Sequence, residues 1–278
     1  MDNPYWKNCS RYVGSAFFDI AKHDEFYNKL ISRLIEALSP YRSLTAVVGM
    51  SGGKDSTITI ALLLKAGFKV RAITYCCNQG SAKNADEQYE YVREVESYFR
   101  GQNFEHKARC ITLESDYCQW TSSPEEINAH WEYKLPMRRA TLLYEEAQRL
   151  NRNGTPAAVF GTTNFTEAYL GYCGKASDLA CDFQPIISLP VSILIQVGLA
   201  LGVPSELVNR QPTGDTMDLL TSEERLGFSM FDADLSMVGR CVNEDALRKI
   251  ENHRRINAHK FADNGEIMGC FRPIRIAL

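Results

Sequence analysis

The chain has 278 residues, of which 45% are apolar and 23% are charged, and its formal net charge at pH 7 is −3. This length is enough for one large domain or two small ones with a sizeable core, and the composition is that of an ordinary soluble globular protein. The slight acidic excess argues against a protein that coats nucleic acid, because that task usually requires a strong basic excess. A local basic patch remains possible at Arg138-Arg139 and at residues 253–255.

The nine cysteines form neither a CxxC pair nor the spacing of a zinc site. An odd number of cysteines without a secretion signal indicates reduced thiols, so we expect a cytoplasmic protein. The most apolar segment, residues 186–203, is interrupted by Pro190 and Gln196. A membrane span needs about twenty apolar residues with few interruptions, so we expect a buried loop and helix there and no membrane partner.

Apolar periodicity divides the chain into alternating helices and strands. Residues 24–38 have apolar side chains at helical spacing, and residues 44–50 form the short, continuous apolar run of a central parallel strand. The later expected elements are a helix over 57–66, a strand over 69–75, a helix over 86–99, a strand over 106–113, a helical stretch over 124–150 broken near Pro136, and a strand over 157–161. The alternation predicts an α/β fold with a doubly wound, mostly parallel sheet flanked by helices, and we expect one domain over residues 1–278.

Residues 51–56, Ser-Gly-Gly-Lys-Asp-Ser, join the first predicted strand to the next helix. Paired glycines permit unusual backbone angles, and the first amides of a helix lack internal partners and carry partial positive charge. These amides and the hydroxyls of Ser51 and Ser56 would converge on one anion. Asp55 would repel a bare phosphate, and a Mg²⁺ ion held by carboxylate and phosphate oxygens resolves that conflict.

A plain turn with an aspartate cap is the alternative for this loop, but it would need neither both serines nor the paired glycines. The loop is not of the Walker type, in which four residues separate the first glycine from Gly-Lys-Ser/Thr. It resembles the SGGxDS loop of the N-type ATP pyrophosphatases. In that superfamily ATP is cleaved between its α and β phosphates, AMP is transferred to an acceptor, and pyrophosphate stays in the loop.

A second stretch narrows the resemblance. Residues 161–178, GTTNFTEAYLGYCGKASD, are similar to the GTxNxxE…GYFTKYGD segment of ammonia-dependent NAD synthetases. Further matches in the same order are DFQPI at 182–186, LGVP at 201–204, QPTGD at 211–215, EERLG at 223–227 and HRR at 253–255. Because the matches extend from about residue 47 to residue 255, the chain resembles a divergent member of that family.

The resemblance implies an NH3-dependent NAD+ synthetase with a Rossmann-like, adenine nucleotide alpha hydrolase-like fold. The nicotinate carboxylate of deamido-NAD would attack the α-phosphate of ATP, and ammonia would then displace AMP to give NAD+. The resemblance also implies Mg²⁺, a homodimer, and no nucleic-acid partner.

The same resemblance implies roles for particular positions. For ATP these are Gly49, Ser51, Gly52, Gly53, Lys54, Asp55, Ser56, Thr162 and Thr213. For deamido-NAD they are Arg139, Tyr144, Lys175, Asp178, Asp182, His253 and Arg254. Asp55 and Glu167 would hold Mg²⁺ and, with Lys54, are the predicted catalytic residues. Taken without the resemblance, Glu167 is a carboxylate favoured at a helix start, and residues 253–255 are a solvated helix end.

Some positions depart from the family pattern. The family's ATP-contacting lysine falls on Val191, and we hypothesise that Lys54 replaces its charge. Met137 stands in place of an arginine, and residues 174–180 differ where the family surrounds the nicotinate. Three alternatives therefore stay open: an adenylating amidoligase for another carboxylate-bearing nucleotide, a tRNA-modifying enzyme, which the acidic balance disfavours, and a catalytically silent ATP-binding homologue, which the Asp55–Glu167 pair disfavours.

Overall fold

The computed structural model describes residues 24–77, 82–111, 124–210, 221–241, 243–262, 267 and 272–274. Of the predicted site residues, Thr213 lies outside these ranges.

A six-stranded parallel sheet forms the centre of the fold, in the order β3-β2-β1-β4-β5-β6. The strands are β1 (Thr45–Gly49), β2 (Lys69–Cys77), β3 (Phe104–Ile111), β4 (Ala157–Phe160), β5 (Phe183–Gln184) and β6 (Arg272–Pro273). In the register, Val48 of β1 lies opposite Ala72 on one side and Phe160 on the other. The chain winds outward from β1 to β3 and then returns to place β4 beside β1. The connections after β1 and β4 therefore leave in opposite directions, and ligands of such sheets bind in the crevice at that point.

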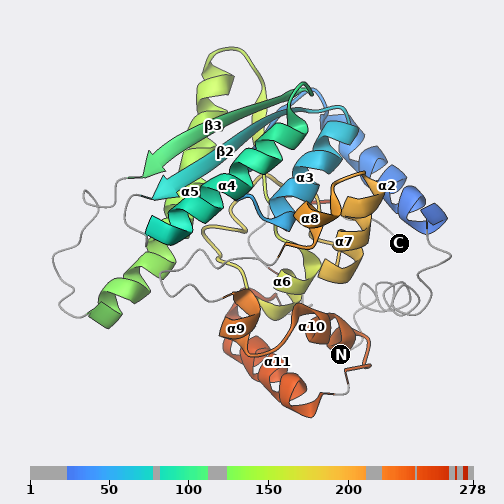
Figure 1. Ribbon diagram of the computed structural model, residues 1–278, viewed down its shortest axis with the longest axis vertical. Helices are drawn as coiled ribbons and strands as arrows, with labels where there is room; N and C mark the ends of the chain where they lie inside the picture. The colour runs from blue at the N-terminus through green and yellow to red at the C-terminus, as the bar shows by residue number, and fades with distance from the viewer. Residues whose placement is uncertain are drawn as a thin grey trace.

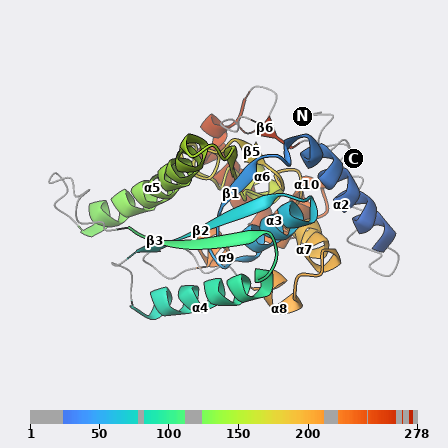
Figure 2. The ribbon, with the colours of Figure 1, turned by 90° about the horizontal axis from the view of Figure 1, so that it is seen from above.

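Helices cover both faces of the sheet (Figure 2). One face is covered by α2 (Asp24–Leu38), α3 (Lys54–Lys65), α4 (Ala82–Phe99) and α7 (Val191–Ala200), and Ala46 and Val48 join their apolar side chains in the main core. The other face is covered by α5 (Pro124–Arg152), which packs on Val47 and Val159. Alternate residues of β1 thus face opposite layers, which explains the continuous apolar run of Ala46, Val47 and Val48. The predicted α/β fold is confirmed.

A group of short helices lies at the lower end of the molecule in Figure 1. These are α6 (Phe165–Leu170), α9 (Ser222–Leu226), α10 (Met230–Met237) and α11 (Glu244–Ile256). They bury an apolar cluster that includes Tyr169, Phe228 and Ala233. The remaining helical turns are α8 (Ser205–Val208), η2 (Ser39–Tyr41) and η4 (Ala258–Lys260).

Several boundaries differ by a few residues from the sequence-based expectation, such as α4, which begins at Ala82 and not at residue 86. Helix α3 begins at Lys54, because Gly53 takes the N-cap position with an extended backbone. The predicted break near Pro136 is wrong, since α5 continues through it. A proline removes one backbone donor from a helix, and here Leu135 and Leu142 hold the flanking turns against the sheet.

Candidate active site

The loop of residues 51–56 follows β1, at the carboxyl end of a central strand, and its last three residues form the first turn of α3. The backbone N–H of Gly53 donates to Ser51 Oγ at 3.2 Å, and Ser51 Oγ lies 3.3 Å from Ser56 Oγ. Ser56 Oγ and Thr57 Oγ1 donate to the carbonyl of Gly53 at 3.0 and 2.8 Å. The two predicted serines therefore lie side by side and fix the turn that opens the helix.

Gly52 is required at its position for two reasons. Its φ is 82°, a left-handed conformation that is strained for residues with a Cβ atom. A Cβ atom there would also lie 2.8 Å from Cβ of Tyr91 on α4. The loop thus packs directly against α4 through bare backbone.

The second predicted loop, residues 161–164, lies between β4 and α6. Asn164 and Glu167 form a reciprocal cap at the start of α6: the Asn164 side chain accepts from the Glu167 N–H, and the Glu167 carboxylate accepts from the Asn164 N–H, both at 3.0 Å. From β5, the buried Gln184 side chain accepts from the Thr163 N–H at 3.2 Å and donates to the Asp178 carbonyl at 2.8 Å. Strand β5 therefore supports the loop from behind.

The structure brings the two loops together at Asp55. One carboxylate oxygen of Asp55 accepts from Asn164 Nδ2 at 3.1 Å, and the other lies 3.0 Å from Lys54 Nζ. Lys54, Asp55 and Glu167, the three predicted catalytic residues, thus form one cluster with Asn164. Sequence reasoning included Asn164 in a motif but assigned it no role, although an Asn three residues before a Glu is the pattern of a capping box.

The charge of Asp55 raises the pKa of both Lys54 and Glu167. Burial would lower the pKa of Lys54, but the charges of Asp55 and Glu167 outweigh burial and raise it, so the side chain is an ammonium. Burial, and then the charge of Asp55, raise the pKa of Glu167 to about 8. Glu167 therefore holds a proton at pH 7 unless a further cation lies beside it, and a bound cation would favour its ionised form.

These residues suit a hard divalent cation. Mg²⁺ binds through one or two carboxylates together with phosphate oxygens and water. Within the described ranges, no group of three or more His, Cys, Asp or Glu residues is arranged to hold a metal, so a fully protein-made cage is not found there. Asp55 and Glu167 offer the oxygen ligands that a phosphate-bridging ion requires, and Glu167 would lose its proton when such an ion binds.

Val191, where the family lysine would fall, is buried at the start of α7 against the apolar cluster of Tyr169 and Phe228. Beside it, the fully buried Asp234 accepts hydrogen bonds from Thr166 Oγ1 and from the N–H of Ser192. Burial raises the pKa of Asp234 to about 6, although its hydrogen bonds and the charge of Lys54 oppose that rise. The positive charge of Lys54 thus favours the ionised form of Asp234 at the start of α7.

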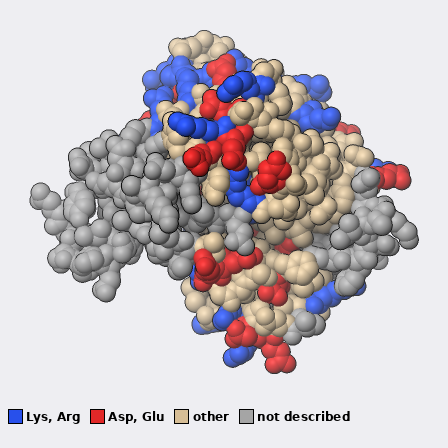
Figure 3. All heavy atoms as spheres, in the orientation of Figure 1, with Lys and Arg blue, Asp and Glu red and all other residues tan. Residues whose placement is uncertain are grey.

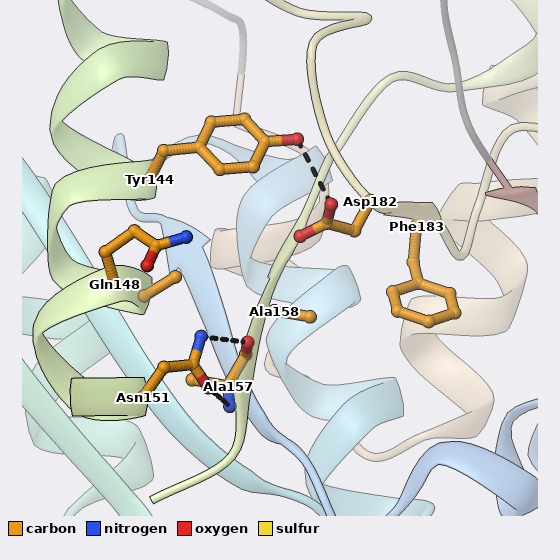
Figure 4. A pocket seen from close by; sticks show the side chains of 8 residues that line it. Tyr144, Gln148, Asn151, Ala157, Ala158, Asp182 and Phe183 are labelled. Atoms are coloured by element: carbon orange, nitrogen blue, oxygen red, sulfur yellow. Dashed lines mark hydrogen bonds between the residues drawn. The ribbon is translucent and has the colours of Figure 1, made fainter. Parts of the chain in front are cut away.

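A pocket of about 380 Å³ lies between α5 and strands β4 and β5 (Figure 4). Tyr144 Oη donates to Asp182 Oδ1 at 3.3 Å across its mouth, and Asp182 Oδ2 accepts from the Val159 N–H at 2.8 Å. Gln148 and Asn151 extend the polar lining along α5. The structure thus brings together two predicted acceptor residues, Tyr144 and Asp182, although the pocket lining includes no residue of the 51–56 loop. Arg139 is half-buried on the same helix.

The remaining predicted acceptor residues surround the connection after α6. Lys175 Nζ donates to the His259 carbonyl at 2.7 Å, and Asp178 accepts from the Gly174 N–H at 2.7 Å. His253 is 3.2 Å from Asn257 Nδ2, and the Arg254 guanidinium lies 3.9 Å from the centre of the Tyr169 ring. Burial, and then the charge of Lys260, lower the pKa of His253. These side chains bond to other residues of the same part of the fold. Their roles in binding an acceptor therefore stay predictions, as do the roles of Gly49 and the half-buried Thr162 in binding ATP.

The family model described as NAD synthase matches residues 26–263. This chain belongs to the NAD synthase family. The predicted class is thereby confirmed: the chain is a ligase that forms a carbon–nitrogen bond, and NAD synthetases use ATP as a substrate.

Two curated relatives illustrate the family. The NH3-dependent NAD+ synthetase of Thermoplasma acidophilum is 29% identical over 240 residues, which is 84% of this chain and 95% of that protein. The NH3-dependent NAD+ synthetase of Mesoplasma florum is 26% identical over 238 residues, covering 85% of this chain and 93% of that protein.

Solved structures show the same fold. The NMN synthetase from Francisella tularensis aligns with a TM-score of 0.67 at 24% identity, over 84% of this chain and 94% of that one. The NH3-dependent NAD synthetase from Campylobacter jejuni, in complex with nitrate, aligns with a TM-score of 0.57 at 20% identity, over 88% and 96% of the two chains. In the part of the chain that the structure describes, no helix is both long and apolar enough to cross a membrane.

Proposed function

We propose that this chain is an ammonia-dependent NAD+ synthetase. ATP adenylates the nicotinate carboxylate of deamido-NAD with release of pyrophosphate, and ammonia then displaces AMP to give NAD+. The observation that carries the proposal is the junction of the two loops at Asp55, where Lys54, Asn164 and Glu167 meet at the ends of adjacent strands. Without those contacts the motifs would be separate sequence matches.

The chain's own groups account for the adenylation step. The loop amides and the hydroxyls of Ser51 and Ser56 would hold the β and γ phosphates, and the Lys54 ammonium would compensate the charge that develops on departing pyrophosphate. Asn164 holds the Asp55 carboxylate in place, so little reorganisation is needed when phosphate arrives. Thr162 and Thr213 are proposed as further ATP contacts.

Asp55 and Glu167 would hold Mg²⁺, which supplies charge neutralisation of the phosphates when bound. Their oxygen chemistry and the raised pKa of Glu167 support this assignment. Lys54 is then the proposed replacement for the lysine that the family has at Val191, because it is a buried ammonium in the phosphate loop, 3.0 Å from Asp55.

For the acceptor, we propose the pocket along α5 as part of the site. Tyr144 and Asp182 would bind hydroxyl groups of the nucleotide, and Arg139 its phosphate. The proposed set also includes Lys175, Asp178, His253 and Arg254. Among the described residues on the face shown in Figure 3, acidic and basic side chains are interspersed without a continuous basic field, which supports a small acceptor over a nucleic acid.

A second acceptor has one observation in its favour. The Francisella structure, whose name gives NMN as the product, aligns with a higher TM-score than the Campylobacter NAD synthetase. The acid that corresponds to NMN, nicotinic acid mononucleotide, carries the same carboxylate as deamido-NAD but lacks the adenylyl half. Nicotinic acid mononucleotide is therefore the specific second candidate for the acceptor, in place of deamido-NAD.

The test is release of pyrophosphate from Mg–ATP in the presence of ammonium, with deamido-NAD, with nicotinic acid mononucleotide and without acceptor. We expect release with deamido-NAD and formation of NAD+, verified by mass. Release only with the mononucleotide would reject deamido-NAD as the acceptor and still support adenylation of a nicotinate carboxylate. Binding of ATP without release under any condition would indicate a silent homologue.

We also propose a cytoplasmic homodimer. The homodimer is what the family resemblance of the sequence implies. Sedimentation equilibrium should then give about twice the 31.4 kDa mass of the chain. A monomer at micromolar concentration would contradict the dimer.

A further inference from the structure

Arg210, which follows α8, joins three parts of the fold. One guanidinium nitrogen donates to the carbonyl of Gly52 at 3.1 Å, and another pairs with Glu94 on α4. The guanidinium carbon lies 3.9 Å from the centre of the Tyr91 ring, also on α4. The Arg210 side chain is only 12% exposed, whereas its partner Glu94 is 55% exposed, so the bond to Gly52 is better shielded from water than the ion pair.

The bond to Gly52 fixes the plane of one peptide in the phosphate loop. In a trans peptide, the C=O and the following N–H point in opposite directions. Holding the Gly52 carbonyl toward Arg210 therefore turns the Gly53 N–H away from it, toward Ser51 Oγ, to which it donates at 3.2 Å. A cationic donor on the carbonyl also polarises this peptide, which makes its N–H a stronger donor.

Tyr91 also contacts Gly52. A Cβ on Gly52 would lie 2.8 Å from Cβ of Tyr91 and 3.0 Å from its backbone carbonyl carbon, and the Tyr91 ring supports the Arg210 guanidinium. Gly52 is thus held both by α4 and by Arg210. A loop held at both its Cα and its carbonyl has one orientation before any phosphate arrives.

We propose that Arg210 is a positioning residue for phosphate binding, acting through the Gly52–Gly53 peptide of the 51–56 loop. The inference rests on the proposed function only in that this loop binds the pyrophosphate of ATP, and it does not depend on which acceptor is used. Arg210 does not itself contact substrate. Its planar fork serves the carbonyl, the carboxylate and the ring at once, which a lysine is unable to do.

The experiment compares Arg210→Met and Arg210→Lys with the matched control Arg93→Met. Arg93 is also an arginine over a tyrosine of α4, 4.9 Å from the Tyr89 ring, but no bond joins it to the loop. Calorimetry would measure binding of inorganic pyrophosphate with Mg²⁺ and of Mg–ATP, and thermal unfolding would be followed in parallel. We expect Arg210→Met to weaken binding of both ligands by about tenfold or more, Arg210→Lys to recover part of the loss, and Arg93→Met to bind as the wild type does.

In turnover assays, the KM for ATP should rise in Arg210→Met while the KM for the acceptor stays within about twofold. Unchanged pyrophosphate binding in Arg210→Met, even with a lowered melting temperature, would overturn the inference and leave a purely structural salt bridge. Equal losses in Arg93→Met would also overturn it. If no acceptor supports turnover in the wild type, the proposed function fails, whereas the binding comparison still decides the role of Arg210.

Discussion

At the scale of single residues, Asp55 and Lys54 are adjacent in one loop and carry opposite charges with different proposed tasks. We expect Asp55→Asn to lower turnover by at least about 10²-fold, because the amide keeps the shape but loses the charge that a phosphate-bridging metal needs. The fold should survive, since the new side-chain oxygen still accepts from Asn164, but the melting temperature should fall because buried Lys54 loses a charged partner. Pyrophosphate release is the measurement, and Asp245→Asn, an exposed change on α11, is the control. Near-normal turnover in Asp55→Asn would reject the metal assignment.

Lys54 gives a second prediction at this scale. Lys54→Ala should raise the KM for ATP by about tenfold or more, because a charged partner of phosphate is lost. Lys65→Ala, at the exposed end of the same helix, should leave the KM unchanged.

The double variant Lys54→Ala/Val191→Lys tests whether the two positions are equivalent. Partial recovery of the KM in the double variant is expected if the charge acts from either position. Melting temperatures should accompany these assays, because Val191 is buried in an apolar cluster. An unchanged KM in Lys54→Ala would reject the replacement hypothesis.

At the scale of elements, Glu146 ties α5 to the outer strands of the sheet. Its buried carboxylate pairs with Arg71 of β2 at 2.9 Å, with Lys107 and Arg109 of β3 at 3.3 and 3.4 Å, and with Arg149 of α5 at 2.6 Å. The hydrogen bond from Arg149 is the largest cause that lowers the pKa of Glu146, to about 2, and burial opposes it.

The pH dependence follows from the sign of this shift. A carboxylate whose pKa is lower in the folded state stabilises the fold above its unfolded pKa of 4.5, and that stability is lost as the pH falls toward about 2. We expect Glu146→Gln to lower the free energy of unfolding at pH 7 by about 3 kcal/mol, since it removes the buried one of the two acidic partners of Arg71 and leaves only the half-exposed Glu105, and to remove part of the acid sensitivity. Urea unfolding at pH 7 and pH 3 measures both effects. Glu105→Gln, whose carboxylate is half-exposed, should cost at most about 1 kcal/mol.

The same elements show what the sequence reveals and what it does not. Central strands such as β1 are predictable, because burial on both faces leaves a continuous apolar run. Strands β5 and β6 have two residues each, too few for any periodicity, and the continuity of α5 through Pro136 depends on packing against the sheet.

In the site, Asp55 and Glu167 were predictable from motifs. The bond from Asn164 to Asp55 spans 109 residues and that from Arg210 to Gly52 spans 158. Contacts of that span are set by the fold, and a single sequence carries no local signal for them.

At the scale of the whole molecule, β6 connects a distant part of the chain to the site. The N–H of Ile274 donates to the Gln184 carbonyl at 3.2 Å, and its side chain, 6% exposed, joins the main core. Gln184 in turn supports the loop of residues 161–164. We expect Ile274→Ala to lower the free energy of unfolding by about 2–4 kcal/mol, whereas Ile256→Ala, at a side chain that is 60% exposed, should be nearly neutral. Equal effects in urea titrations of the two variants would contradict this placement.

The position of β6 also bears on the order in which the molecule folds. Strands β1 to β4 are joined by single helical crossovers, whereas β6 reaches β5 only after α7 to α11 have intervened. Closing so long a chain segment costs entropy before any contact compensates for it, so we expect the β5–β6 edge to form after the transition state. A change at Ile274 should then accelerate unfolding and leave the refolding rate nearly unchanged. The phosphate loop after β1 would thus belong to the part of the protein that assembles early, and the loop that β5 supports would acquire its final shape last.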